Sequence, residues 1–534
     1  MKIQFFLLIT VLEVVLSCQT PSKKTLSLVA NRDTSISLAN SYNGLFFDSL
    51  QLENFIVREK LHDSMATAMR DFYNRRNYQY AWFFKEGMAD YAATFLNQQN
   101  DYINYSGDSS IYNIVLQTSL ESLSDTTSYN PPDSLKLKTE FLLTRQFFRY
   151  ASRAYAGRRD INTKDLGWYI PRKKIDAVGL LDSLLVNRGK NLSQYEPVNR
   201  QYNLLKDYLL KYYEAEKKGV WKPIVADKKS YKRGDSSSTI VQIKKRLLLT
   251  GDLTTRDTTA FFTDSLGTAI KRYQHRYGLT EDGIAGASLF IEMNRPINDR
   301  IRQILINMER IRWVPAQPST DYLLVNIPEF RLHVYDKGNY GWNMKVVVGA
   351  VAHNTVIFNG NLKYVVFSPY WNVPQSIIKK EVVPGMKRNK NYLANHNMEW
   401  NGGAVRQKPG PGNSLGLVKF LFPNSYNIYL HDTPSKSLFG ESTRAFSHGC
   451  IRLAEPKRLA EFLLRNEPTW NEASITRAMN SGKEKYVTLK QTIPVFIGYF
   501  TAWVDRDGKL NFRDDIYGHD KEMAEHLFAT AKNK

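Results

Sequence analysis

The chain has 534 residues, carries a formal net charge of +21, and is 43% hydrophobic. That length exceeds one ordinary domain, so about two to four domains are expected, and the apolar content excludes an intrinsically disordered chain. The charge favours a polyanionic partner such as nucleic acid, anionic lipid or an acidic wall polymer, although a basic soluble surface explains it equally well. Because lysines and arginines form no block and no nucleic-acid-binding motif occurs, we expect no nucleic-acid partner.

The first 18 residues have the pattern of an export signal. Lys2 precedes a mostly apolar run at 3–16, and Cys18 follows a small residue. This pattern is similar to a bacterial lipoprotein signal, which predicts that Cys18 is lipidated and that residues 19–44 form a tether. Glu13 departs from the pattern, and a plain secretory signal or an anchor helix remains an alternative. No later stretch reaches the ~18 apolar residues of a membrane span, so we expect the rest of the chain to be soluble.

Residues 45–230 have helical periodicity. Apolar and aromatic side chains recur at spacings of three and four, most clearly at 135–156 and 202–218. No catalytic constellation occurs in this region, so we predict a helical scaffold domain. Residues 298–312 form a further amphipathic helix, and the segment 295–315 is a candidate to pack back on the scaffold.

Residues 231–294 predict a compact unit of three short amphipathic helices with glycine-marked ends. A Leu/Gln helix, a Gly turn, a Tyr-Gln helix and a Gly-Leu-x-x-Asp-Gly-x-x-Gly turn follow one another in order. This order resembles the peptidoglycan-binding domain that accompanies many wall enzymes, and a generic three-helix bundle is the alternative.

From Tyr322 the apolar period changes from 3.6 to 2, which indicates β-strands. We predict a β-rich domain at 320–500, followed by a C-terminal extension at 501–534. A less regular stretch at about 373–424 interrupts the strands, and an insertion of that length is often functional, so we expect a lid. The fold class expected is therefore multidomain α+β: a helical scaffold, a small three-helix domain, and a β-rich catalytic domain with a capping insertion.

Cys450 ends the string Ser-His-Gly-Cys at 447–450, and it is the one thiol left if Cys18 belongs to the signal. A thiol becomes a strong nucleophile as the thiolate, and a neighbouring imidazole can take its proton. His431 lies upstream, with Tyr429 two residues before it on a predicted strand, so that both side chains share one face. This set of residues predicts acyl transfer through a thioester.

Gly449 allows the backbone to approach closely, and N–H groups around it can hold an oxyanion. Three other interpretations stay open at this point. His431, His448 and Cys450 are possible zinc ligands, although no paired ligand spacing accompanies them. Ser447 with His448 is an alternative nucleophile and base, and a buried cysteine without chemistry is the third interpretation.

These residues resemble the signature of the L,D-transpeptidase (YkuD) family, in its large periplasmic type with a scaffold, a peptidoglycan-binding domain and a capping insertion. The resemblance rests on His431, followed after 15 residues by 447–450, with supporting strings at 369–374, 406–413 and 419–424. It implies these roles: Cys450 as nucleophile, His431 as general base, the backbone carbonyl of Asp432 as the group that orients His431, His448 and Gly449 in the oxyanion hole and pocket, and Tyr429, Arg452 and Trp400 in substrate binding.

The resemblance also implies a reaction. Cys450 attacks the carbonyl of the third residue of a tetrapeptide stem, D-Ala leaves, and an amine of a second stem completes a 3→3 cross-link. No metal or organic cofactor is implied, and carbapenem-type β-lactams would acylate Cys450. The implied location is the periplasm of a Gram-negative-type bacterium, with a lipid anchor in the membrane. An L,D-carboxypeptidase or endopeptidase that uses water, and a catalytically idle wall-binding scaffold, are the alternatives.

Overall fold

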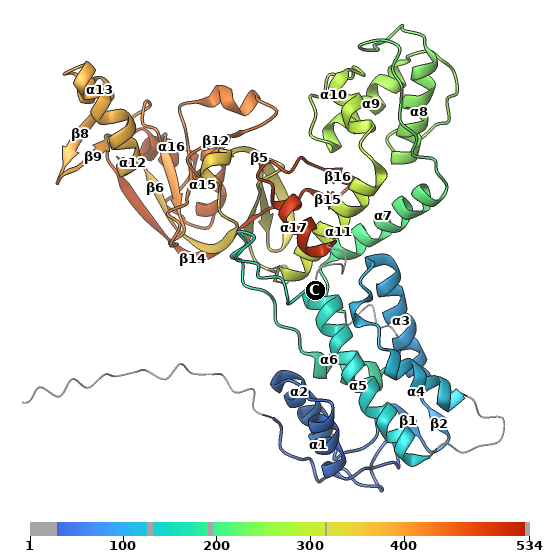
Figure 1. Cartoon of the computed structure of the whole chain (residues 1–534). Coiled ribbons are helices and arrows are strands. Elements are labelled where there is room, and N and C mark those ends of the chain that lie inside the picture. The colour runs from blue at the N-terminus through green and yellow to red at the C-terminus, as the bar shows by residue number, and fades with distance from the viewer. Residues whose placement is uncertain (1–28, 125–131, 191–195, 316–317, 529–534) are drawn as a thin grey trace, which may run out of the picture. The chain divides into compact units, whose positions relative to one another are not determined.

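The computed structural model describes residues 29–124, 132–190, 196–315 and 318–528 (Figure 1). The expected signal and its lipidated Cys18 lie outside these ranges. The chain separates into two compact units. One consists of residues 1–92 and 114–148, and the other of residues 93–113 and 149–534.

The first unit is helical with one short hairpin. Its core is aromatic: the ring of Phe47 lies edge-on to Tyr73 and to Phe141, each at a centroid distance of 5.0 Å. Its elements are α1 (Ser49–Arg58), α2 (Asp63–Asn74), β1 (Phe83–Phe84), β2 (Gly87–Met88), α4 (Ile114–Ser124) and the first part of α5 (Asp133–Ala156). The whole of helix α5 coincides with the helix predicted at 135–156.

The second unit begins with further helices. Its helices before the β-rich region are most of α3 (Asp90–Ser106), the end of α5, α6 (Ala177–Val186), α7 (Arg200–Lys217), α8 (Ser238–Thr250), α9 (Asp264–Arg276), α10 (Ala287–Met293) and α11 (Ile297–Trp313). Helices α8 to α10 form the predicted three-helix unit. Ser237 caps α8 by accepting from the N–H of Thr239, and Gly251 ends it with φ 76°.

Helix α11 connects the three-helix unit to the β-rich region and packs on α7 and on the C-terminal helix α17 (His519–Leu527). The guanidinium of Arg312 donates to the hydroxyl of Tyr202 at 2.6 Å, and Arg310 pairs with Asp520 at 2.5 Å. The hairpin of β15 (Ala502–Val504) and β16 (Leu510–Phe512) also contacts α11. The segment expected to be a C-terminal extension is therefore an integral part of this unit.

The β-rich region is a nine-stranded sheet in which β5 also pairs with β4, so that the strands close into a barrel. The order is β12-β5-β13-β11-β10-β6-β14-β3-β4. The bounds are β3 (Tyr322–Asn326), β4 (Arg331–Asp336), β5 (Asn339–Gly349), β6 (Phe358–Phe367), β10 (Val418–Leu421), β11 (Leu430–His431), β12 (Ala445–Ser447), β13 (Ile451–Leu453) and β14 (Lys485–Gly498).

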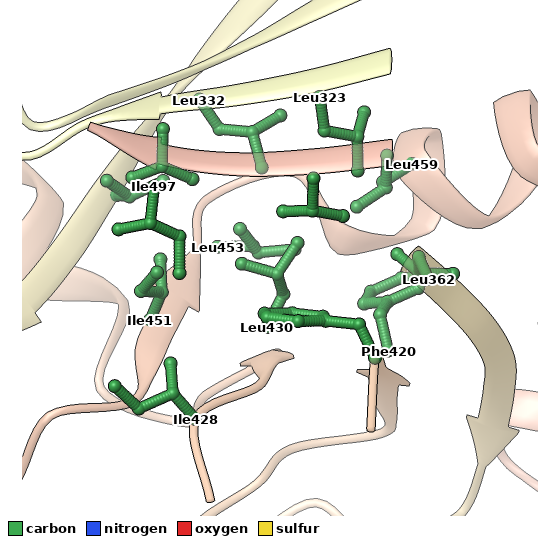
Figure 2. Packing of buried hydrophobic residues seen from close by; sticks show 14 of the residues in the cluster. Leu323, Leu332, Leu362, Phe420, Ile428, Leu430, Ile451, Leu453, Leu459 and Ile497 are labelled. Atoms are coloured by element: carbon green, nitrogen blue, oxygen red, sulfur yellow. The ribbon is translucent and has the colours of Figure 1, made fainter. Parts of the chain in front are cut away.

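The barrel interior is an apolar core, because alternate residues of each strand point inward. Figure 2 shows these side chains packed from strands far apart in the sequence, with Leu323 and Leu332 above Leu430 and Phe420. All four are 0% exposed. Helices α15 (Pro456–Leu464) and α16 (Glu472–Met479) add Leu459 and other buried residues to the same core.

The insertion forms a small unit of its own. It contains β7 (Trp371–Asn372), α12 (Gln375–Ile377), α13 (Val383–Arg388), α14 (Tyr392–Asn395), β8 (Met398–Asn401) and β9 (Ala404–Gln407) around a separate apolar cluster. Its expected end at residue 424 is wrong, because 418–421 is strand β10 of the barrel. Val418 and Phe420 are 0% exposed. The strand has only four residues and lies between turns, so its alternation of apolar residues was too short to be recognised in the sequence.

The multidomain α+β architecture expected from the sequence is confirmed. Within the described ranges, none of the helices combines the length and the apolar character that crossing a membrane requires.

Candidate active site

The candidate site is built by the parallel pairing of β11 with β13 on the outside of the barrel. Leu430 lies opposite Ile451 in this pairing, and both are 0% exposed in the core. Since side chains alternate along a strand, the neighbouring residues point the other way. The residues turned outward together are Tyr429, His431, Cys450 and Arg452. The register therefore brings together four residues that lie on two separate segments of the sequence.

His431 is buried and held in one orientation. Its Nδ1 lies 2.5 Å from the backbone carbonyl oxygen of Asp432, which accepts the ring proton and leaves Nε2 as the basic atom. Burial and the charge of Arg452 lower the pKa of His431 to about 4, while the carbonyls of Asp432 and Leu415 act in the opposite direction. The imidazole is therefore neutral in the resting site.

The carboxylate of Asp432 anchors the same segment. It accepts hydrogen bonds from the N–H of Leu417 at 2.9 Å and from the Lys436 ammonium at 2.5 Å. Gly416 passes so close to this carboxylate that an added Cβ would lie 2.4 Å from it, and its φ is +61°. Only glycine fits there. The Gly416 turn therefore fixes the position of Asp432, whose carbonyl in turn orients the His431 ring.

The Cys450 thiol is half-buried and lies beside Tyr429. Its Sγ donates to the carbonyl of Asn427 at 3.6 Å. Burial raises the pKa of the thiol, whereas hydrogen bonding from Tyr429 and the charge of Arg452 lower it. In the described chain no hydrogen bond joins Sγ to the ring of His431. The resting pair is thus a neutral thiol and a neutral imidazole on one face.

The turn before Cys450 presents backbone donors. Gly449 has φ +107°, which favours glycine. Its N–H donates to Ser447 Oγ at 3.1 Å, and its place in an oxyanion hole stays a prediction. The N–H groups of His448 and Cys450 have no acceptor within the described residues. These two are the donors left for an oxyanion.

The residues of two rival interpretations, Ser447 and His448, have other contacts in this turn. Ser447 Oγ donates to the carbonyl of Cys450 at 2.5 Å and is 3% exposed, so it shapes the turn rather than acting as a nucleophile. The exposed His448 ring stacks on His353 at a centroid distance of 5.1 Å. Among the side chains the structure describes, no group of three His, Cys, Asp or Glu has a metal-binding arrangement.

A loop after β5 supports the turn from behind. Thr355 is 1% exposed, and its Oγ1 donates to the carbonyl of Gly449 and accepts from the N–H of Gly349, both at 2.8 Å. The N–H of Ala350 donates to the carbonyl of Ser447 at 2.8 Å. The loop and the turn are therefore held as one piece. No local motif marks Thr355 or His353, and sequence reasoning missed both.

Tyr517 holds that loop from the C-terminal segment. Its hydroxyl donates to the carbonyl of Gly349 at 2.6 Å and accepts from the N–H of Thr355 at 3.3 Å. Its own N–H donates to the hydroxyl of Tyr499 at 3.0 Å. A chain of hydrogen bonds thus runs from Tyr517 through Thr355 to Gly449, the residue beside Cys450.

The remaining predicted residues lie in different settings. Arg452 is half-buried, and its guanidinium has no carboxylate or other acceptor in the described part of the chain. A bound carboxylate is a suitable partner for such a group. Trp400 lies on β8 of the insertion and is 52% exposed. No hydrogen bond or ring contact within the described ranges joins Trp400 to the four residues on the barrel.

Three regions of the chain match known protein families. Residues 320–478 match the family described as "L,D-transpeptidase catalytic domain", and this range includes all four outward-facing residues. Residues 67–209 match "Scaffold domain", and residues 236–293 match "Putative peptidoglycan binding domain". The described β11–β13 site therefore lies inside the matched catalytic domain.

A Haemophilus influenzae protein described as "Putative L,D-transpeptidase" is 32% identical over 260 residues, which are 45% of this chain and 52% of that protein. The chain thus spans about half the length of this relative. An L,D-transpeptidase from Stackebrandtia nassauensis is 15% identical, covering 52% of this chain and 98% of that one, with a TM-score of 0.21. A transpeptidase solved in complex with imipenem is 15% identical, covering 33% and 59%, with a TM-score of 0.19. The match to the catalytic-domain family therefore rests on the sequence comparisons and not on these two structures.

Alkylation of Cys450 should depend on pH. Since burial raises its pKa, the rate with iodoacetamide should rise with a midpoint above that of a free cysteine, about 8.5. Arg452→Gln removes a charge that favours the thiolate and should move the midpoint higher. Mass spectrometry of the Cys450 peptide measures the rate. Arg477→Gln, an exposed change on α16, should leave the midpoint unchanged. A midpoint below that of free cysteine would contradict this electrostatic description.

Tyr517→Phe should weaken the support of the turn. Phenylalanine cannot make the two hydrogen bonds of the hydroxyl, to the carbonyl of Gly349 and from the N–H of Thr355. At about 0.5–1.5 kcal/mol each, their loss corresponds to a roughly five- to 160-fold slower acylation of Cys450 by a carbapenem. Alkylation by iodoacetamide should change less, because it needs no oxyanion hole. The matched control is Tyr208→Phe, which also removes a 2.6 Å hydroxyl-to-carbonyl bond, to Gly508. Equal effects of both changes on acylation would show that Tyr517 has no special role.

Proposed function

This chain carries the catalytic domain of the L,D-transpeptidase (YkuD) family, and we propose that it forms 3→3 peptidoglycan cross-links by acyl transfer through Cys450. The observation that carries the proposal is the β11–β13 register, which sets a thiol, a neutral imidazole, a tyrosine and an unpaired guanidinium on one face. Two free backbone N–H groups beside the thiol complete the set.

The reaction begins as the Cys450 thiol approaches the carbonyl of the substrate. The proton on Sγ moves to Nε2 of His431 as Sγ leaves the carbonyl of Asn427 and approaches the substrate. The low pKa of His431 makes it a weak base at rest, but an adjacent thiolate favours the imidazolium, as do the carbonyls of Asp432 and Leu415. Tyr429 and Arg452 stabilise the anionic sulfur. Proton transfer therefore accompanies attack instead of preceding it.

In the acylation step, Sγ attacks the carbonyl carbon of the third residue of a tetrapeptide stem. The carbonyl π electrons move to oxygen, and the N–H groups of His448 and Cys450 donate to the oxyanion. The C–N bond to D-Ala then breaks, and the imidazolium of His431 returns its proton to the departing amine. The product is a thioester on Cys450 and free D-Ala.

In the deacylation step an amine of another stem attacks the thioester. His431 takes a proton from that amine, the C–S bond breaks, and the proton goes back to sulfur. The new amide joins two third-position residues, and Cys450 is restored. Water in place of the amine gives a tripeptide, which is the carboxypeptidase alternative. The insertion (371–407), with Trp400 on β8, is suited to cap the donor and limit the access of water.

Substrate recognition follows from the charges. Arg452 would bind a carboxylate of the stem, since its guanidinium lacks a partner in the described chain. The domain at 236–293 would hold the glycan, in line with its family description. Carbapenems would acylate Cys450 because ring opening of a β-lactam uses the same nucleophile and oxyanion donors.

Intact-protein and product mass spectrometry with a tetrapeptide-bearing muropeptide tests the mechanism. The native protein should release D-Ala and form a cross-linked dimer. Cys450→Ala should lower the rate by at least about 1,000-fold, since the nucleophile is removed. His431→Gln should abolish turnover, while Arg477→Gln, exposed on α16, should leave it intact.

Each alternative has its own result in this assay. Dimer that persists in Cys450→Ala would refute the cysteine mechanism. Tripeptide without dimer would assign a carboxypeptidase or endopeptidase instead. Binding to peptidoglycan sacculi with neither product would assign an idle wall-binding scaffold.

We propose further that the protein is a periplasmic lipoprotein anchored through Cys18, on the strength of the pattern at residues 1–18. Cys18→Ser should move the protein from the detergent-extracted membrane fraction to the soluble fraction. Mass spectrometry of the N-terminal peptide should find acyl chains on Cys18 in the native protein only. An unmodified mature N-terminus at any other residue would refute the anchor.

A further inference from the structure

A cavity of about 690 Å³ lies in the second unit, on strands other than those of the candidate active site. Its size falls within the range of small-molecule pockets, about 300–1,000 Å³. None of Tyr429, His431, Cys450 and Arg452 lines it. Its walls come from the outer faces of β3 and β4, the ends of α7 and α11, the β15–β16 hairpin and His275 of α9. The cavity is therefore bounded by the barrel, the linker helix, the C-terminal hairpin and the three-helix unit, and it is partly open to solvent.

Strand alternation sets the lining of the barrel wall. Leu323 and Leu332 are 0% exposed in the barrel core, so their neighbours in sequence point the other way. The neighbours that line the cavity are Tyr322, Leu324, Arg331 and His333. A face that would meet water on an isolated barrel is instead covered by the helices and the hairpin, and space remains beneath the cover.

One carboxylate in the lining faces an excess of cations. Glu329 is 9% exposed, and its Oε2 lies 2.8 Å from Nε2 of His333. The charges of His333, Arg513 and Arg331 hold the pKa of Glu329 at about 2 despite its burial. Arg513 is fixed by donating to the backbone carbonyls of Arg276 and His275 at 2.7 and 3.2 Å. The positive charges of two guanidiniums, Arg331 and Arg513, thus act on the single carboxylate of Glu329.

Arg331 is a cation in this lining with unused hydrogen-bond donors. One of its terminal nitrogens, Nη1, donates to the side chain of Asn343. Its Nε and Nη2 have no acceptor within the described residues, and the side chain is half-buried in the cavity wall. A guanidinium edge with two free donors has the geometry that binds a carboxylate through two parallel hydrogen bonds.

Aromatic rings complete the lining around Arg331. The cavity includes Tyr322, Tyr340 and Trp503. The guanidinium of Arg506 lies over the ring of Tyr340 at 5.2 Å, and that of Arg513 lies over the ring of Trp503 at 5.0 Å. Such rings offer apolar surface to a ligand body. The four arginines of the lining outnumber its three carboxylates, which are Glu329, Asp505 and Asp507. The chemistry suits a ligand with a carboxylate head and a body of peptide size.

We propose that this cavity is a second binding site for the carboxylate of a peptidoglycan stem peptide, with Arg331 as the carboxylate-binding residue. The choice of a stem peptide rests on the proposed function, whereas the choice of a carboxylate rests on the cavity itself. A stem bound here would be held by the same unit that carries the catalytic face, so the site would raise the local concentration of stems near Cys450.

Calorimetric titration with a free tetrapeptide stem tests the proposal. Cys450 is first alkylated with iodoacetamide so that the active site is blocked, and the probe lacks glycan so that it avoids the three-helix domain. One saturable site is expected. Arg331→Gln should weaken binding by about tenfold or more, Arg331→Lys by less, and the exposed change Arg477→Gln should have no effect. A tetrapeptide with amidated carboxylates should not bind.

Leu324→Trp gives an independent variant, because it fills the cavity without removing a charge. It should also abolish binding, and thermal unfolding checks that each variant is folded. Equal binding by the native and Arg331→Gln proteins, equal binding of the amidated peptide, or no saturable binding would overturn the proposal. If tetrapeptide binding is lost in Arg331→Gln but the unblocked protein makes no cross-links, the proposed function fails while the cavity site stands.

Discussion

The parallel pairing of β11 with β13 is the constraint on which the site depends. The register that places Leu430 opposite Ile451 in the core also places His431 opposite Arg452 on the outside. A slip of one residue would turn the reactive side chains into the apolar core and the core side chains outward. The free energy of burying the barrel core therefore also enforces the arrangement of the thiol and the imidazole.

Burial at the site has opposite effects on its two titrating groups. It raises the pKa of Cys450 and lowers that of His431, so both are neutral at rest. Arg452 favours the thiolate and disfavours the imidazolium. In the proposed mechanism a charged pair therefore forms only when a substrate draws the sulfur forward, and the same low dielectric then strengthens the hydrogen bonds to the oxyanion. This arrangement suits a nucleophile that must be reactive only in the presence of its substrate.

Support for the site comes from distant parts of the chain. Tyr517, in the C-terminal segment, lies outside the matched catalytic range of 320–478, yet it holds the loop that carries Thr355 behind Gly449. The same segment supplies the hairpin that covers the cavity at Arg331. The C-terminal segment thus joins the linker helix, the turn before Cys450 and the proposed stem-binding cavity within one unit.

The sequence alone was sufficient to predict the family of the catalytic domain and the residues of its candidate site. Local patterns can be recognised without knowledge of the fold. Such patterns here are the spacing of His431 and Cys450, the shift of apolar period at Tyr322, and the glycine-marked helices at 231–294. The sequence did not reveal that β10 belongs to the barrel or that Ser447 Oγ accepts the hydrogen bond of the Gly449 N–H. It also did not reveal that Tyr517 and Thr355 support the turn. Those facts depend on hydrogen bonds and packing between residues far apart in the chain. Only the closed barrel brings such partners together, so only the tertiary structure decided which backbone donors are free and which side chains face one another.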